Sequence, residues 1–207
     1  MLRSKSLFAI SLALSSLFSR AHAAIVIGYA TLTEEEGQRL SENKGLEIDE
    51  DENYNQLGAG LYTMNNPGNL MGGEGMWYCA IEANEEKLRG ISKVYVPRSY
   101  ERTRSFHRGP EKVDLWGAED DVIVDFIEET YLVQDPAKAL RFSWNHASPW
   151  HLLMVVPIEA ANDDSLDIQA RCFKSKVGLI EATNESINWE HWGIKGTRGA
   201  PGFAPLP

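Results

Sequence analysis

The sequence predicts a protein of the α+β class, built from short strands with one early helix. Helical signals are strong near the start of the chain, where Thr33 and Glu36 have the spacing of a capping box. After them come short runs rich in β-branched and aromatic residues, separated by Gly, Pro and Asn. This order differs from the regular alternation of strand and helix that builds a parallel sheet.

The first residues have the features of a secretory signal peptide. A basic segment at residues 1–5 precedes an apolar run at 7–18, and Ala21-His22-Ala23 fits a cleavage site. The apolar run is too short to cross a bilayer, which takes about 20 residues. We therefore expect residues 1–23 to be a signal peptide and the protein to be secreted and extracellular, with a buried N-terminal helix as the alternative.

The expected elements follow in order from residue 24. The apolar run 24–31 predicts a strand, and the helix capped by Thr33 is expected to end near Asn43, before Lys44-Gly45. Further strands are expected at 57–64, 76–83, 94–97, 122–127, 152–157 and 166–172, and the most apolar of them, 152–157, is expected at the centre. Short helical pieces are expected at 84–88, 136–142 and 181–192, with a long polar loop at 98–112. Residues 24–195 form one expected domain, and 196–207 a flexible Gly/Pro-rich tail.

Charge and cysteine content limit the possible partners. The formal net charge of −10 at pH 7 argues against nucleic acid or an anionic membrane as a partner, because binding phosphates requires Lys and Arg. Cys79 and Cys172 are expected to form a disulfide in an oxidising compartment. Two buried free thiols are the alternative.

Three segments resemble the ADP-ribosyltransferase superfamily, which includes bacterial ADP-ribosylating toxins and tRNA 2′-phosphotransferases. Gly28-Tyr29-Ala30-Thr31 ends a strand before a capped helix, and Gly58-Ala59-Gly60-Leu61-Tyr62-Thr63 resembles the G-x-G-x-Y-x-[TS] strand. Glu119-Asp120-Asp121 precedes the expected strand 122–127, where the superfamily often carries its catalytic acid. Most of residues 25–195 also resembles secreted fungal proteins related to the enterotoxin A-chain group. The resemblance implies a split β-sheet core with one early helix and short peripheral helices.

The same resemblance implies NAD as a substrate, for ADP-ribosyl transfer to a target protein or for hydrolysis. Cleavage of the nicotinamide–ribose bond passes through an oxocarbenium-like state that a carboxylate stabilises. Asp121, or else Glu119, is the implied catalytic acid, and Tyr62 is implied to stack on nicotinamide. The implied NAD-binding residues are Tyr29, Thr31, Gly60, Tyr62 and Thr63. No metal site is expected.

Ala30 departs from the superfamily pattern, since toxin-like relatives carry Arg and phosphotransferase-like relatives carry His at this position. Loss of one charge-assisted contact costs about 1.5–3 kcal/mol. A replacement cation could come from Arg141 or from a basic loop, which alternatively is a solvated patch: Arg98, Arg102, Arg104, His107 and Arg108. The alternative functions are a catalytically inactive effector or toxin-like binding module on the same fold, and a plain extracellular structural protein.

Other patterns are less specific. Tryptophans 144, 150, 189 and 192 could form a sugar-stacking face or belong to the core. Gly58 and Gly60 also fit a tight turn or bulge. Asn184-Glu185-Ser186 is a glycosylation sequon. The sequence contains neither an H-E-x-x-H motif nor a nucleophile elbow, which argues against zinc or serine hydrolase chemistry.

Overall fold

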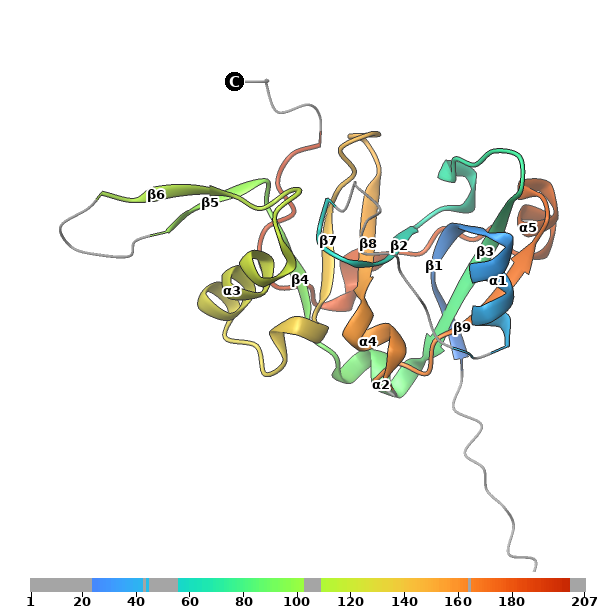
Figure 1. Ribbon diagram of the computed structural model, residues 1–207, viewed down its shortest axis with the longest axis horizontal. Helices are drawn as coiled ribbons and strands as arrows, with labels where there is room; N and C mark the ends of the chain where they lie inside the picture. The colour runs from blue at the N-terminus through green and yellow to red at the C-terminus, as the bar shows by residue number, and fades with distance from the viewer. Residues whose placement is uncertain (1–23, 43, 45–55, 103–108, 164, 202–207) are drawn as a thin grey trace, which may run out of the picture.

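The fold is organised around one seven-stranded sheet, with strand order β4-β7-β8-β2-β1-β3-β9 (Figure 1). The structure is a computed structural model that describes residues 24–42, 44, 56–102, 109–163 and 165–201. The strands of this sheet are β1 (Ala24–Thr33), β2 (Gly60–Met64), β3 (Met76–Asn84), β4 (Lys93–Tyr95), β7 (Leu140–Trp144), β8 (Leu152–Pro157) and β9 (Gln169–Phe173). Neighbouring strands are antiparallel except for β4 and β7. This mixed sheet, with few and short helices, confirms the α+β class.

The sheet is thinly connected between β1 and β2. These two strands pair at one position, Tyr29 with Met64, whereas β1 and β3 pair along their whole length from Ala24 to Thr33. A register shift between Val26 and Gly28 bends β1 next to this point. The sheet therefore has two groups of strands, β9-β3-β1 and β2-β8-β7-β4, which meet at what we call the β1–β2 junction.

The hydrophobic core is continuous on one face of the sheet and divided on the other. Successive side chains of β8 point to opposite faces of the sheet. Met154 belongs to the continuous core, which both strand groups share, whereas Leu153 and Val155 belong to a core on the opposite face. On the divided face, one core lies around Ile123 and Phe126, and a separate one lies around Tyr29 and Leu179. The β1–β2 junction lies between those two cores.

Five α-helices surround the sheet within the described residues: α1 (Glu34–Ser41), α2 (Glu85–Gly90), α3 (Asp120–Tyr131), α4 (Ile158–Asn162) and α5 (Lys176–Ala182). The capping box of α1 is present as expected, because the Thr33 hydroxyl accepts from the Glu36 amide and the Glu36 carboxylate accepts from the Thr33 amide. The strand expected at 122–127 is wrong, since these residues lie within α3. Ile123, Phe126 and Ile127 are the buried residues of that helix. Their spacing of three and four residues is typical of a helix and not of a strand.

Two other expectations about local structure are also corrected. The loop expected at 98–112 contains a separate hairpin of β5 (Ser99–Arg102) and β6 (Glu111–Asp114), which projects from the body (Figure 1). Its Tyr100 packs on Phe126 of α3, and this tertiary contact is invisible in the local pattern. The helix expected at 136–142 is only a 3₁₀ turn at Pro136–Lys138, followed by β7. Helical structure in the late segment consists of α5 and a 3₁₀ turn at Trp189–Trp192.

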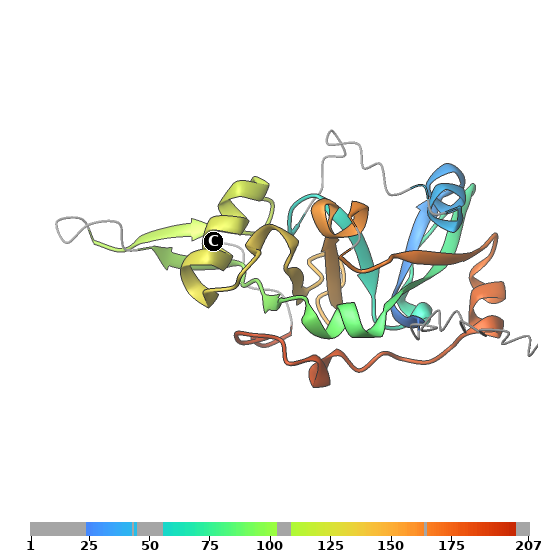
Figure 2. The same cartoon turned by 90° about the horizontal axis from the view of Figure 1, so that it is seen from below.

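The C-terminal segment after α5 runs back along the molecule to the far edge of the sheet (Figure 2). The buried Trp189 indole donates to the Ile27 carbonyl over 2.9 Å, and Lys195 exchanges backbone hydrogen bonds with Lys93 and Tyr95 at β4. From the expected tail, Gly199 accepts a hydrogen bond from the Trp144 indole. The expected signal peptide, residues 1–23, lies outside the described residues.

A disulfide joins Cys79 and Cys172, as expected. The two residues are direct cross-strand partners on β3 and β9. The shared core encloses this pair, since Cys79 is fully buried and α1 packs over Cys172 at Gly37.

Candidate functional site

A pocket opens at the β1–β2 junction, on the divided face of the sheet. Its volume is about 220 Å³, below the range of about 300–1,000 Å³ typical of drug-sized ligand sites. The lining residues come from β1, β2, the two loops above them and β8: Thr31, Gln56, Tyr62, Thr63, Met64, Asn69, Leu70, Met71, Asn145, Ala147, Ser148 and Leu153. None of these side chains carries a charge. We call this site the junction pocket.

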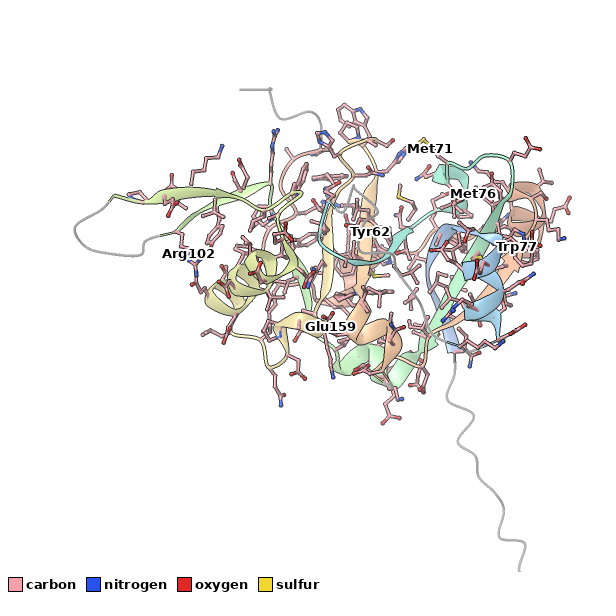
Figure 3. All side chains as sticks on the ribbon, viewed as in Figure 1. Tyr62, Met71, Met76, Trp77, Arg102 and Glu159 are labelled. Atoms are coloured by element: carbon pink, nitrogen blue, oxygen red, sulfur yellow. A yellow bond between two sulfur atoms is a disulfide. The ribbon has the colours of Figure 1, made fainter. Side chains whose placement is uncertain are left out.

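Tyr62 supplies a fixed aromatic ring to the junction pocket. Its hydroxyl donates to the Gly58 carbonyl and accepts from the Leu57 amide, both over 2.8 Å. Burial raises the pKa of this phenol well above its ordinary value, so it stays protonated at neutral pH. Figure 3 shows Tyr62 near the middle of the molecule. With its hydroxyl held by the backbone, Tyr62 can offer its ring to a ligand.

Thr31 supplies the polar group that has no partner. Its Oγ1 atom is buried, and no described residue forms a hydrogen bond with it. The segment carrying Gly72 lies close above it, since a Cβ on Gly72 would stand 3.0 Å from the Thr31 methyl group. Because a buried hydroxyl without a partner costs about 1–3 kcal/mol, the atom points to a ligand or water as its missing partner.

The other expected NAD-binding residues have structural contacts. Thr63 lines the pocket, but its hydroxyl already donates to the Met154 carbonyl over 3.1 Å. Tyr29 is buried away from the pocket, and its hydroxyl donates to the Glu185 carbonyl over 2.8 Å. Gly60 also lies outside the lining, where a Cβ would stand 2.5 Å from the Val156 carbonyl oxygen. The close packing of β2 on β8 therefore explains why residue 60 is a glycine.

The expected acids are not brought to the pocket. Glu119 and Asp121 lie at the start of α3, are exposed, and are absent from the residues that line the junction pocket. Their position is a helix N-terminus, which favours negative charge without any ligand. The acid between them is the one that points inward. Asp120 pairs with the fully buried Arg141, whose Nη1 lies 2.5 Å from one carboxylate oxygen.

That ion pair explains a second glycine of the G-x-G segment. Arg141 Nη1 also donates to the Leu57 carbonyl over 2.8 Å. Gly58 has a φ of +83°, and a Cβ there would stand 2.2 Å from an Asp120 carboxylate oxygen. The positive φ and the lack of space both require glycine. The ion pair holds residues 57–58, which in turn hold the Tyr62 hydroxyl.

The candidate replacement cations that the structure describes, Arg98, Arg102 and Arg141, do not line the junction pocket. Arg141 is committed to Asp120, and Arg102 pairs with Asp125 and Glu129 of α3. Figure 3 shows Arg102 on the side of the projecting hairpin, well away from Tyr62. Arg98 does not line the pocket. Arg104, His107 and Arg108 lie outside the described residues.

Sequence reasoning missed the loop residues of the site. Gln56 accepts from the His146 amide and donates to the Trp144 carbonyl, which ties the loop after β7 to the start of β2. Asn145 and Ser148 lie on that same loop, between two apolar strands. A short polar loop between buried strands is the only signal that could have indicated them.

The geometry defines an α+β protein with a small, uncharged pocket where two groups of strands meet. Residues 55–197, more than half of the chain, match a family of unknown function (DUF5910), and the chain belongs to this family. The matched range contains β2, β8 and the loop after β7, whereas β1 and α1 precede it. A search among curated proteins found no match. Among the described residues, no group of three His, Cys, Asp or Glu could hold a metal ion, and no helix is both long and apolar enough to cross a membrane.

Proposed function

We propose that the chain is a ligand-binding protein on an ADP-ribosyltransferase-like split sheet, whose junction pocket holds a neutral aromatic amide such as nicotinamide. In this proposal it does not cleave NAD. The observation that carries the proposal is the pocket lining, which keeps Thr31 and Tyr62 but includes no charged side chain.

The position of the pocket supports the relation to that superfamily. The strands that carry the two resembling motifs, β1 and β2, are neighbours that pair at a single position. The pocket opens where they part, as a split-sheet ligand cleft would. The disulfide is compatible with the secreted location that we propose, because disulfides persist in oxidising compartments.

The chemistry of the lining supports binding over cleavage. An oxocarbenium-like state needs a carboxylate beside it, and neither Asp121 nor Glu119 is among the lining residues. A neutral carboxamide, by contrast, can exchange a hydrogen bond with the buried, unpartnered Thr31 hydroxyl once the segment carrying Gly72, which lies against Thr31, shifts to uncover it. Its ring can stack on Tyr62, and its size suits a pocket of about 220 Å³ better than a whole dinucleotide does.

The first test compares neutral and charged probes by thermal unfolding. We expect nicotinamide and benzamide to raise Tm, because a ligand of the native state stabilises it by about 2.7 kcal/mol at 100 times its Kd. Nicotinate and benzoate should have no effect, because the pocket offers their carboxylate no cation. Equal stabilisation by nicotinate and nicotinamide would contradict the proposal.

Two matched substitutions locate the binding. Thr31→Val removes a hydroxyl with no protein partner, so it should weaken nicotinamide binding about tenfold with little change in stability. Thr63→Val removes a hydroxyl already bonded to Met154, so it should cost about 1 kcal/mol of stability with little change in affinity. The reverse pattern would show that Thr31 does not contact the ligand.

A second test addresses the enzymatic alternative directly. Purified protein incubated with NAD should release no more nicotinamide than buffer does, and Asp121→Ala should behave in the same way. Release by the wild type that is lost in Asp121→Ala would overturn the binding-only proposal and establish catalysis by that acid.

A further inference from the structure

A second hollow lies beside the junction pocket, at the ends of β2 and β7. Its volume is about 400 Å³, and Asn69 borders both sites. The loop between β7 and β8 separates them, since Ser148 lines the junction pocket while Trp150 and His151 line the second hollow. The remaining lining residues are Asn65, Asn66, Trp144, Leu152, Ser186, Ile187, Asn188, Trp189, Glu190 and Arg198.

Trp150 is the exposed ring of this hollow. It is 69% exposed, and it is the only aromatic residue among the large exposed apolar side chains of the described chain. The other two tryptophans at the hollow have partners, because Trp189 is buried in the core and Arg198 covers the Trp144 ring at 5.1 Å. An indole combines a large apolar face with a polar N–H group, a combination that is enriched at binding interfaces.

Four of the polar side chains that line the hollow are amides, namely Asn65, Asn66, Asn69 and Asn188. Asn66 donates to the Ser186 hydroxyl over 2.6 Å, and Asn188 accepts from the Glu190 amide over 3.0 Å. The Asn69 side chain and the NH₂ group of Asn188 form no hydrogen bond with any described residue. Each amide can both donate and accept, as each sugar hydroxyl can.

Charge in the hollow is internally balanced. Glu190 and Arg198 form an ion pair with each other, and His151 Nδ1 shares a hydrogen bond of 2.8 Å with the Ser148 hydroxyl. The balance favours a neutral ligand over a phosphorylated one, because no cation is left without a partner to bind a phosphate. A neutral ligand with many hydroxyl groups and one C–H face to lay on an indole matches both the amides and Trp150.

We infer that this second hollow is a binding site for a neutral carbohydrate, with Trp150 stacking against a sugar ring and the asparagine amides binding its hydroxyls. The inference is independent of the ligand proposed for the junction pocket, since the two sites use different aromatic rings. The local hydrogen bond between Ser148 and His151 positions the loop that presents Trp150.

The test is isothermal titration calorimetry of the purified protein with a panel of neutral oligosaccharides, namely cello-, chito-, xylo-, manno- and maltohexaose. At least one should bind saturably, with a Kd of about 0.1–1 mM. Trp150→Ala should weaken that binding by about tenfold or more, and Trp150→Phe should recover most of it because the ring face is kept.

Controls separate this site from a general surface effect and from the junction pocket. Leu132→Ala removes an apolar side chain that is even more exposed than Trp150, at 86% exposure, and should leave carbohydrate affinity unchanged. Thr31→Val should also leave it unchanged, and Trp150→Ala should leave nicotinamide binding unchanged. The inference is overturned if none of the hexaoses binds, if Trp150→Ala binds as tightly as the wild type, or if adenosine binds there in place of the sugars.

Discussion

The two strand groups that meet at the β1–β2 junction are stabilised by different chemistry. The group β9-β3-β1 contains the disulfide between Cys79 and Cys172. The group β2-β8-β7-β4 contains the buried Arg141, paired with Asp120 at the start of α3. One group thus contains a covalent link and the other a buried ion pair. The junction pocket lies on the divided face of the sheet, between the separate cores of the two groups.

The chain connectivity makes this difference informative. Cys79 and Cys172 are 93 positions apart in the sequence, and the segment between them includes β4, β7, β8 and α3. Most of the ion-paired group is therefore a long insertion whose two ends the disulfide ties together. A covalent link at the ends limits the unfolded chain, whereas the ion pair acts only in the folded insertion. The two groups should therefore respond differently to reductant and to single charge changes.

The largest expected effect comes from removing the disulfide. For a closed loop of this length the chain-entropy model gives about 4–5 kcal/mol of stability. The double substitution Cys79→Ala/Cys172→Ala should lower the free energy of unfolding by that amount, measured by urea denaturation. The wild type unfolded under reductant should match the double variant. A loss under about 1 kcal/mol would mean that the unfolded insertion is already compact.

The ion pair gives the next largest effect. Asp120→Ala leaves a fully buried guanidinium without its carboxylate, for which the expected cost is about 3–5 kcal/mol. The lower end is expected, because the Asp120 side chain is 34% exposed and water can replace part of the contact. Chemical denaturation at neutral pH measures the change.

Asp121→Ala is the matched control for that prediction. It removes an exposed carboxylate from the same helical turn, so the expected cost is about 0.3–1 kcal/mol, from the helix dipole alone. If both variants lost the same stability, Arg141 would not depend on Asp120, and the contrast between the two strand groups would fail.

A substitution at the junction itself should have an intermediate effect. Gly28 lies on β1 where a Cβ would stand 2.5 Å from Cβ and Oγ1 of Thr63 on β2. Gly28→Ala should therefore push the two strand groups apart and cost about 1–3 kcal/mol. Gly73→Ala is the control, since no atom lies within 4 Å of its added Cβ. If the two variants had the same denaturant midpoint, the two strand groups could separate at the junction without loss of stability.

Elements with a local cause could be predicted from the sequence. The capping box starts α1, the apolar run at 152–157 is the strand β8, and the two cysteines form the disulfide. The prediction of a strand at 122–127 was wrong because five of these six residues are apolar, a composition that fits both a strand and a helix. The elements that pack against the segment decide which of its side chains are buried, and so which structure forms. One of these elements is the hairpin, whose Tyr100 packs on Phe126.

Only part of the candidate site could be predicted from the sequence, again because tertiary contacts decide the rest. Thr31, Tyr62 and Thr63 lie on strands with recognisable patterns, and all three line the junction pocket. The sequence could not place the acids relative to the pocket, because a run of three acidic residues does not reveal which one faces inward. Only the tertiary position of Arg141 selects Asp120 as the buried partner and leaves its two neighbours at the surface.

The smallest expected effect is a pH dependence within the ion-paired group. Asp163, which follows α4, lies 2.6 Å from Lys138 Nζ. Desolvation alone would raise the pKa of Asp163, but hydrogen bonds from Lys138 and Ser165 outweigh it and lower that pKa. A lowered folded pKa contributes stability above the unfolded value of about 4, and this stability is lost as pH falls through the folded value. Asp163→Asn should therefore flatten the acid limb of a plot of Tm against pH.

The partner of Asp163, Lys138, has the opposite pH dependence, and the two together give a test at neutral pH. The hydrogen bond with Asp163 raises the pKa of Lys138, so its contribution is present below the unfolded value of about 10.4 and is lost as pH rises through the folded value. At pH 7, Lys138→Met and Asp163→Asn should lower Tm by similar small amounts, and the double variant should lose little more than either. Additive losses would show that the two charges act separately. The pH sensitivity would then have to come from other carboxylates of the insertion.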